Sequence, residues 1–365
     1  MEFGLTLEQR QFDDSLRALL RDHLPMDRLR AIAEPGGGYD EQLWRALTEL
    51  GLHGLLVPEQ FGGAGLGILD AAVAAEALGN TAAPVPFTGP LVMATLALLH
   101  SASGALQDEY LPMIAGGEVR FAVGFTGQSG QTGTATVNLQ DGRLSGRVEA
   151  VMDAGAATHA LIYLADGHAA VAAIDQPGVT TTLHRSVDRT RPTADLTFDD
   201  AKAERLDAAN APVATAQFVL DAGRVMLAAD TLGAAQHMLD AAVAFAKERV
   251  QFDRVIGSFQ GVKYMLADCV TVLEPCRAMV WYAAHAQDAI PDEARLTACH
   301  AKAHLGEVAR DVARITTEAH GGMGFTDLLG LHYWFKRIGF NRQMLGAPER
   351  CRREAAQLQG WTPED

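Results

Sequence analysis

The stretch Arg249-Val250-Gln251-Phe252-Asp253-Arg254-Val255-Ile256-Gly257-Ser258-Phe259-Gln260 lies between two long segments, 213–249 and 259–287, in which we expect helix. It places the basic Arg249 close to the aromatic Phe252 at a helix end. Such a pair suits an anionic cofactor with a flat ring, although charged runs of this kind are more often solvated helix faces. Taken alone, the stretch predicts the junction of two long helices and does not identify a function.

The character of the chain changes twice on the way to this stretch. Residues 1–117 carry apolar residues at helical spacing, 118–208 consist of short β-like runs separated by turn signals, and helix returns from about residue 209. The order helix, β, helix, without βαβ alternation, argues against a doubly wound sheet. We therefore predict a mainly α fold with a central β domain: an N-terminal helical domain (1–117), a middle β domain (118–208) and a C-terminal helical bundle domain (209–365). The expected strands include 120–125, 160–164, 169–174 and 195–198; the expected C-terminal helices are 213–249, 259–287, 291–320 and a short one after Pro348.

Composition and charge exclude several function classes. The 365 residues are 48% hydrophobic, which excludes a disordered chain, yet no run approaches the roughly 20 apolar residues of a membrane span. Forty-five acidic against thirty basic residues give a net charge of −15, so the basic footprint that binds nucleic acid is lacking. The charged N-terminus does not resemble a secretory signal, and the four cysteines lack CxxC spacing, so we expect reduced thiols in a cytoplasmic protein.

Familiar catalytic motifs are missing from the sequence. It contains no GxSxG, HExxH or Walker A pattern and no GxGxxG between a strand and a helix. His300 and His304 share a helix face, but without a third ligand a surface or core pair is the better interpretation, and we predict no metal site. The run Gly321-Gly322-Met323-Gly324 follows a long helix. By itself it favours a helix end over a place where a phosphate or ring approaches the backbone.

Taken together and in order, these features resemble the acyl-CoA dehydrogenase family. The resemblance rests on residues 50–65, on Leu232-Gly233-Ala234-Ala235-Gln236, on the stretch 249–260 and on His320-Gly321-Gly322-Met323-Gly324-Phe325, which flank a β region of about 90 residues. It implies a helical domain, a β-barrel-like domain and a C-terminal four-helix bundle. It also implies FAD, an acyl-CoA substrate and α,β-dehydrogenation, with each FAD site built by two subunits and an electron-transferring flavoprotein as the usual electron acceptor.

The resemblance assigns roles to individual residues. It places Arg249, Phe252, Gln260, Gly321 and Gly322 among the cross-subunit FAD contacts, with Glu318 where the family usually has Gln. It gives Thr126 the role of the threonine that hydrogen-bonds the flavin. Asp221 and Arg224 match residues that contact CoA, with an ordinary i, i+3 ion pair as an equally weighted alternative.

The departures from the family concern catalysis. The usual catalytic glutamate precedes the last helix, where this chain has Leu345, and the second place for it, on the helix starting near Asp221, is Gly223. Neither residue can accept a proton. The flavin-binding loop is altered in residues 126–133, and the segment that stacks on the flavin reads Ala150-Val151-Met152-Asp153, without its aromatic residue.

Three hypotheses follow. In the first, the chain is the base-lacking subunit of a heteromeric dehydrogenase, like those of steroid-degrading bacteria, and completes the FAD site of a partner acting on a bulky acyl-CoA such as a steroid side-chain thioester. In the second, it is a self-sufficient homo-oligomer whose base has moved, with Glu349 as the first candidate and Asp230 as the second. In the third, it is a non-catalytic acyl-CoA-binding protein. These motifs do not distinguish a dehydrogenase from an oxidase.

Overall fold

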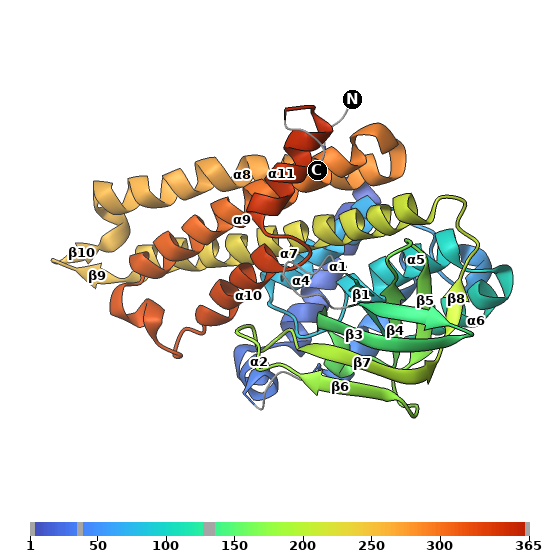
Figure 1. Cartoon of the computed structure of the whole chain (residues 1–365). Coiled ribbons are helices and arrows are strands. Elements are labelled where there is room, and N and C mark those ends of the chain that lie inside the picture. The colour runs from blue at the N-terminus through green and yellow to red at the C-terminus, as the bar shows by residue number, and fades with distance from the viewer. Residues whose placement is uncertain (1–3, 35–38, 127–135, 362–365) are drawn as a thin grey trace.

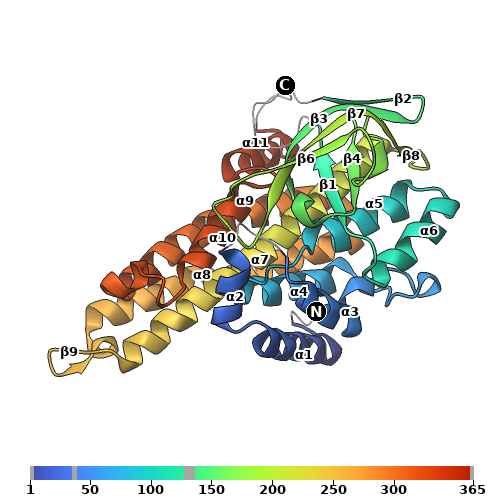
Figure 2. The same ribbon diagram turned by 90° about the horizontal axis from the view of Figure 1, so that it is seen from below.

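The fold is mainly helical around a central β region, as predicted. The structure, a computed structural model, describes residues 4–34, 39–126 and 136–361. Three long helices of the C-terminal part run beside one another, with the N-terminal helices and the β region packed along one side of them (Figures 1 and 2). No helix among the described residues is both long and apolar enough to cross a bilayer.

The N-terminal part contains an alanine-rich helix, α4 (Ile68–Asn80), which is buried along most of its length and packs against α1, α7 (Pro212–Glu248) and α8 (Gln260–Ala289). Thr6 and Gln9 form a capping box at the start of α1, and the Asp40 carboxylate caps α3. A π-helical turn, η3 (Thr88–Met93), leads directly into α5. The other helices of this part are α1 (Leu7–His23), α2 (Met26–Ala33), α3 (Glu41–Glu49), α5 (Ala94–Ser101) and α6 (Gly104–Ala115).

The β region contains two four-stranded sheets that share one apolar core. Their strand orders are β1-β4-β5-β8 and β2-β3-β7-β6, and β1 pairs in parallel with β4 while the other pairs are antiparallel. Ala122, Ile162, Val148 and Leu196, from strands of both sheets, are buried in this core. The strands are β1 (Phe121–Phe125), β2 (Val137–Gln140), β3 (Arg143–Met152), β4 (His159–Tyr163), β5 (Ala169–Ala173), β6 (Val179–Leu183), β7 (Thr193–Lys202) and β8 (Glu204–Leu206).

The long C-terminal helices are confirmed to within two residues at each end. They are α7 (Pro212–Glu248), α8 (Gln260–Ala289) and α9 (Pro291–Ala319), and the predicted final helix is α11 (Pro348–Leu358). Helix α10 (His332–Gln343), which packs on α7 and α9, escaped the sequence analysis. Its buried positions are held mainly by residues with polar atoms, Tyr333, Trp334, Arg337 and Asn341, so apolar periodicity is weak there.

Helices α4 and α7 touch through their backbones. A Cβ atom on Gly79 would lie 1.9 Å from the Asp230 carbonyl oxygen, and one on Gly233 would lie 1.9 Å from the carbonyl oxygen of Glu76. Both positions therefore require glycine. This contact fixes the N-terminal part against the middle of α7, where the next group of residues lies.

Asp230 joins all three parts of the chain through a buried charge cluster. Its carboxylate accepts hydrogen bonds from Arg191, at 2.9 Å, and from Arg337, at 2.8 and 2.6 Å. Arg191 follows the β6 strand, Arg337 lies on α10, and Arg337 also donates to the Ala83 carbonyl oxygen of the N-terminal part at 3.0 Å. Asp230 and both arginines are at most 1% exposed, so each charge depends on its partners.

We expect Asp230→Asn to destabilise the chain strongly. The substitution leaves two buried guanidinium groups without their shared carboxylate, and breaking a buried pair costs about 3 kcal/mol or more. The measurement is urea unfolding. Asp240→Asn, which changes an exposed carboxylate on the same helix, is the matched control and should shift the midpoint little; equal midpoints for the two variants would contradict the role of Asp230.

The cluster also predicts a pH dependence. Burial raises the pKa of Asp153 from 3.8 to about 6, despite attraction to Arg191 and Arg337 and with Asp188 and Asp230 adding repulsion. Because the folded-state pKa is raised, the stability tied to this group is complete below pH 3.8 and is lost as the pH rises through 6. The unfolding free energy of Asp153→Asn should therefore rise relative to that of the wild type by about 3 kcal/mol across this pH interval. Unfolding free energies of the two proteins between about pH 4 and about pH 8 test this, and a constant difference between them would refute it.

Candidate functional site

The residues assigned to the cross-subunit half of a FAD site gather at one end of the helical bundle. Helix α7 ends, α8 begins and α9 ends there, and a hairpin of β9 (Val250–Gln251) and β10 (Arg254–Val255) joins α7 to α8. The rings of Phe245 and His320 pack 4.7 Å apart and connect the hairpin side to the turn that follows α9. The structure thus brings the two motifs together, although about 70 residues separate them in sequence.

Phe252 occupies the tip of this hairpin in an unfavourable backbone conformation. Its φ angle is 51° and that of Asp253 is 61°, which is uncommon for any residue other than glycine and most of all for a bulky one. The Phe252 side chain is 87% exposed. An aromatic residue that is held in a strained turn and exposed to solvent favours a binding role over a packing role.

The glycines beside the hairpin leave the backbone open. Gly321 has a φ angle of +60°, and a Cβ atom added to it or to Gly322 would meet no atom within 4 Å. Arg249, Gln260 and Glu318 are exposed at the same end, with Gln260 donating to the Tyr264 hydroxyl at 2.5 Å and Glu318 accepting from Arg314 at 2.8 Å. An exposed guanidinium, an aromatic ring and an uncovered glycine backbone fit the phosphates and flat ring of a dinucleotide.

This end of the bundle points away from the chain's own β region. Both views show the β9–β10 hairpin at the opposite extremity of the molecule from the sheets (Figures 1 and 2). A single chain therefore cannot bring its bundle-end residues to its own β region.

The two expected places of the catalytic base lie side by side and are apolar. A Cβ atom added to Gly223 on α7 would lie 2.7 Å from Leu345 Cδ1 and 2.7 Å from Met93 Sδ. Two positions 122 residues apart in the sequence thus converge on one point, which supports their assignment as alternative places for one base. The three nearest atoms to that point belong to Leu345 and Met93, and neither side chain accepts a proton.

Arg224 is fully buried beside this point, in a second charge cluster. It donates to both carboxylate oxygens of Glu354, at 2.7 and 2.9 Å, and to Asp221, at 2.9 Å. Its Nε donates to the Leu345 carbonyl oxygen at 2.9 Å. The i, i+3 ion pair weighed in the sequence analysis is therefore present. These contacts fix the loop before α11, and the hydrogen bonds from Arg224 help to lower the pKa of Glu354 to about 2 against the opposing effect of burial.

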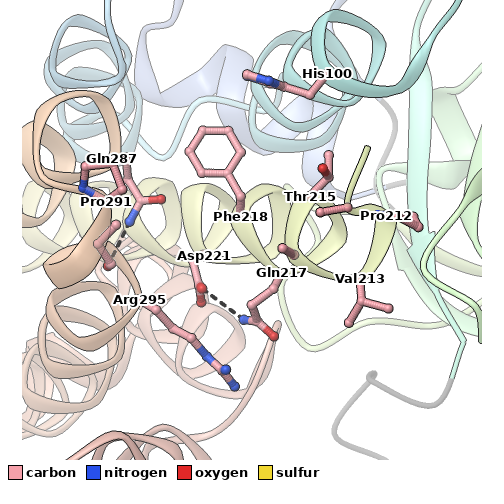
Figure 3. A pocket seen from close by; sticks show the side chains of 13 residues that line it. His100, Pro212, Val213, Thr215, Gln217, Phe218, Asp221, Gln287, Pro291 and Arg295 are labelled. Atoms are coloured by element: carbon pink, nitrogen blue, oxygen red, sulfur yellow. Dashed lines mark hydrogen bonds between the residues drawn. The ribbon is translucent and has the colours of Figure 1, made fainter. Parts of the chain in front are cut away.

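A cavity of about 980 Å³ opens on the other side of Asp221, between the ends of four helices (Figure 3). Its lining is mostly apolar and includes Phe218 and Pro291, with Gln287 and Arg295 as polar groups. Burial raises the pKa of Asp221 to about 6, while Arg224 and the hydrogen bond from Gln217 act in the opposite direction. The Oε1 atom of Gln287 is buried without a hydrogen-bond partner. A large apolar cavity with a few polar groups is typical of a ligand site.

The flavin-holding half assigned to the β region is only partly described. The Thr126 hydroxyl donates to the Tyr163 carbonyl oxygen at 2.9 Å, so its proton is used within the chain. Residues 127–133 of the altered loop lie outside the described part of the chain. In the segment expected to stack on a flavin, Asp153 is 3% exposed with a φ angle of 59° and lies 3.9 Å from Arg191.

The two candidates for a relocated base have different surroundings. Glu349 lies in the first turn of α11 with a 65% exposed side chain, 3.1 Å from Arg342. Its backbone hydrogen bond and Arg342 lower its pKa, the opposite of what a base in a dry site requires. Asp230 is bound by two arginines in the buried cluster described above. Neither environment resembles that of a general base.

Comparison with known proteins decides the family. The model of the acyl-CoA dehydrogenase N-terminal domain matches residues 6–118, and that of the C-terminal domain matches residues 212–358. The chain belongs to the acyl-CoA dehydrogenase family. Its members are FAD-dependent oxidoreductases that act on the CH–CH bond of acyl-CoA.

The similar proteins include a steroid acyl-CoA dehydrogenase. The chain is 30% identical over 354 residues to the acyl-CoA dehydrogenase IpdE2 of Mycolicibacterium smegmatis, covering 96% of this chain and 99% of that one. The structure of a variant of the steroid acyl-CoA dehydrogenase Tcur3481-Tcur3483 is 30% identical, with a TM-score of 0.87 and coverage of 97% and 98%. The butyryl-CoA dehydrogenase of Megasphaera elsdenii, at 23% identity and a TM-score of 0.90, shares the fold.

Three residues of this site were missed by the sequence analysis. Glu354 neutralises Arg224, Met93 fills the point between the two base positions, and Gln287 faces the cavity. Met93 and Gln287 carry no sequence signal. Glu354 lies four residues after Arg350, with which it pairs at 3.0 Å, but this helical spacing predicts an ordinary surface pair.

We expect Glu349→Gln to leave dehydrogenase activity nearly unchanged in any assembly of this chain that is active. The exposed carboxylate is paired with Arg342 and lacks the burial that would keep it basic. Removal of a true general base would lower kcat by about a hundredfold or more. Steady-state kinetics measure this difference, and an unchanged midpoint of thermal unfolding shows that the variant is folded; a loss of that size would establish Glu349 as the base.

Proposed function

We propose that this chain is the base-lacking subunit of a heteromeric acyl-CoA dehydrogenase and that it completes the FAD site of a partner subunit. The main observation in its favour is that Gly223 and Leu345 lie next to each other in apolar surroundings. Both places for the base converge there, and Leu345 and Met93 fill them. The reaction requires a carboxylate that removes the α-proton, and in this proposal the partner subunit supplies it.

The exposed residues at the bundle end are a second, independent argument for the same proposal. Arg249, Phe252, Gly321 and Gly322 remain exposed and uncovered although the base is lost. A chain that had lost all function in the reaction would have no need to hold Phe252 in a strained turn. In the proposed assembly, Arg249 binds the pyrophosphate, and the glycine backbone and Phe252 hold the adenosine side of the partner's cofactor.

One of the similar proteins agrees with a steroid-type substrate. The solved structure at 30% identity over nearly the whole chain is a steroid acyl-CoA dehydrogenase with two named components. We infer a bulky acyl-CoA, such as a steroid side-chain thioester, as the substrate of the assembly, and a cytoplasmic location.

The chemistry divides between the subunits. Bound FAD supplies the hydride acceptor for α,β-dehydrogenation. The residues of this chain bind and orient: the bundle end holds the cofactor's phosphates, and the apolar surface around Leu345 keeps water out. Asp221, with its pKa of about 6, faces the cavity and can accept a hydrogen bond from an amide of a CoA thioester. An electron-transferring flavoprotein is the proposed electron acceptor.

The test is expression of the chain alone and with a homologue that carries the glutamate. Alone, the chain should be colourless; together, the complex should contain FAD and oxidise an acyl-CoA. Close to one FAD per chain in the isolated protein would refute the proposal and favour the self-sufficient enzyme. If the protein stays colourless even with the partner present and still binds a thioester, the result would favour the hypothesis of a non-catalytic acyl-CoA-binding protein. The cavity of about 980 Å³ is consistent with that hypothesis.

Within an active complex, Arg249→Ala should lower the FAD content by at least about tenfold, because it removes the exposed guanidinium that pairs with the pyrophosphate. Flavin absorbance per complex after gel filtration gives the measurement. The matched control is Arg310→Ala on α9, an exposed arginine paired with Glu307 at 2.8 Å, which should retain full flavin. Equal FAD contents in both variants would contradict the cofactor role of the bundle end.

A further inference from the structure

Two of the four cysteines lie together beside the Arg224 cluster. Cys299 on α9 and Cys351 on α11 are both 0% exposed and belong to one small packed cluster with Ala303 and Ala355. Each thiol affects the pKa of the other, which places the two sulfur atoms close together in this cluster. All four cysteines are free thiols, but Cys269 and Cys276 lie on α8 in the main core.

The charges around this pair favour a thiolate on Cys351. Arg224 Nη1 lies 3.4 Å from Cys299 Sγ, and the buried Lys302 ammonium donates to the Gly346 carbonyl oxygen at 3.2 Å, which is also the acceptor of the Cys351 thiol at 3.6 Å. The interaction with Cys299, together with Arg224 and Lys302, lowers the pKa of Cys351 below its ordinary value, against burial and Glu354. The same interaction and burial raise the pKa of Cys299.

The pKa values of the other two thiols are raised. Burial raises the pKa of Cys276 to about 11, and burial with the nearby Asp268 raises that of Cys269. The thiolate is the reactive form of cysteine, so the four thiols should differ strongly in reactivity near neutral pH. The chain therefore contains its own reference thiols for an experiment.

A short path leads from the large cavity to the pair. Asp221 and Arg295 line the cavity, and each contacts the Arg224–Glu354 pair, with Arg295 3.5 Å from Glu354. Glu354 Oε2 in turn lies 3.9 Å from Cys299 Sγ. One layer of polar side chains thus separates the thiols from a cavity that admits small polar molecules.

We propose that Cys299 and Cys351 form a redox site that hydrogen peroxide converts to a disulfide between α9 and α11. The Cys351 thiolate attacks one peroxide oxygen, the O–O bond breaks, and a sulfenic acid and hydroxide form. The Cys299 sulfur then attacks the Cys351 sulfur, the S–O bond breaks, and the Cys299 proton leaves with the oxygen as water. Each sulfur gives up one electron, and the peroxide accepts both. The disulfide removes the thiol that Arg224 Nη1 contacts and ties the final helix to the bundle.

The site lies apart from the bundle end. It borders the point between Gly223 and Leu345 through Arg224, but the proposed function gives neither thiol a role in binding FAD or in removing a proton. The proposal therefore does not depend on the function argued above. It applies to the isolated chain and to a complex with a partner, and both are suitable for the experiment.

The test is mild oxidation of the reduced, folded protein by hydrogen peroxide, followed by alkylation and mass spectrometry without reduction. We expect a loss of about 2 Da, a cross-linked peptide pair containing Cys299 and Cys351, and reversal by dithiothreitol. Cys269 and Cys276 should remain alkylatable. Oxidation of all four cysteines at similar rates, or no cross-link while the protein stays folded, would overturn the proposal.

Two variants separate the roles of the thiols. Cys299→Ser should accumulate a sulfenic acid on Cys351 that the probe dimedone traps, whereas Cys351→Ser should react at least about tenfold more slowly than the wild type. Cys276→Ser is the matched control and should form the disulfide normally. A dimedone adduct on Cys299 in place of Cys351 would contradict the assignment.

The pH profile of the wild-type reaction supplies a readout that packing alone would not change. Its rate should reach half of its maximum at a pH below the value of about 8.5 for an ordinary thiol. A profile centred at or above about 8.5 would overturn the assignment. The titratable and charged groups around the pair are Asp221 and Arg224 on α7, Arg295 and Lys302 on α9, Arg342 on α10, and Arg350 and Glu354 on α11.

Discussion

The buried carboxylate of Asp230 is the interaction on which the arrangement of the molecule depends. Arg191 reaches it from the β region and Arg337 from α10, and Arg337 extends to the backbone of the N-terminal part. Neither arginine could stay buried without this shared partner, because an unpaired charge in the interior is costly. The three parts of the chain therefore pack as one body, and Gly79 and Gly233 allow α4 to come close enough to α7 for this packing.

The consequence is a molecule with two distant functional regions. With the β region held on the middle of α7, the hairpin and glycine turn extend from the far end of the bundle, where another chain can meet them (Figure 1). The two regions can therefore change independently. In this chain the bundle end presents groups that suit a dinucleotide, while the atoms nearest to a Cβ on Gly223 belong to Leu345 and Met93, which carry no carboxylate.

The sequence was informative where local rules decide the structure. Apolar periodicity and Pro or Gly punctuation located α7, α8 and α9 to within two residues. The family resemblance named Gly223 and Leu345 as two separate places for a base, and the structure brings the two positions together. Helix α10 escaped because its buried side includes Arg337 and Asn341, whose burial depends on Asp230, a residue more than 100 positions away. Glu354 and Met93 escaped for the same reason, since their partners come from other helices.

The buried guanidinium of Arg224 depends on Glu354 for its neutralisation. Arg224 is fully buried beside the apolar point. It forms an ion pair with Asp221, which lines the cavity. The bidentate contact with Glu354 neutralises the guanidinium, and the bond from Arg224 Nε to the Leu345 carbonyl oxygen holds the loop before α11. The same positive charge, with that of Lys302, lowers the pKa of the adjoining Cys351 thiol. The electrostatic contacts that hold this loop thus also set the environment of the proposed redox pair.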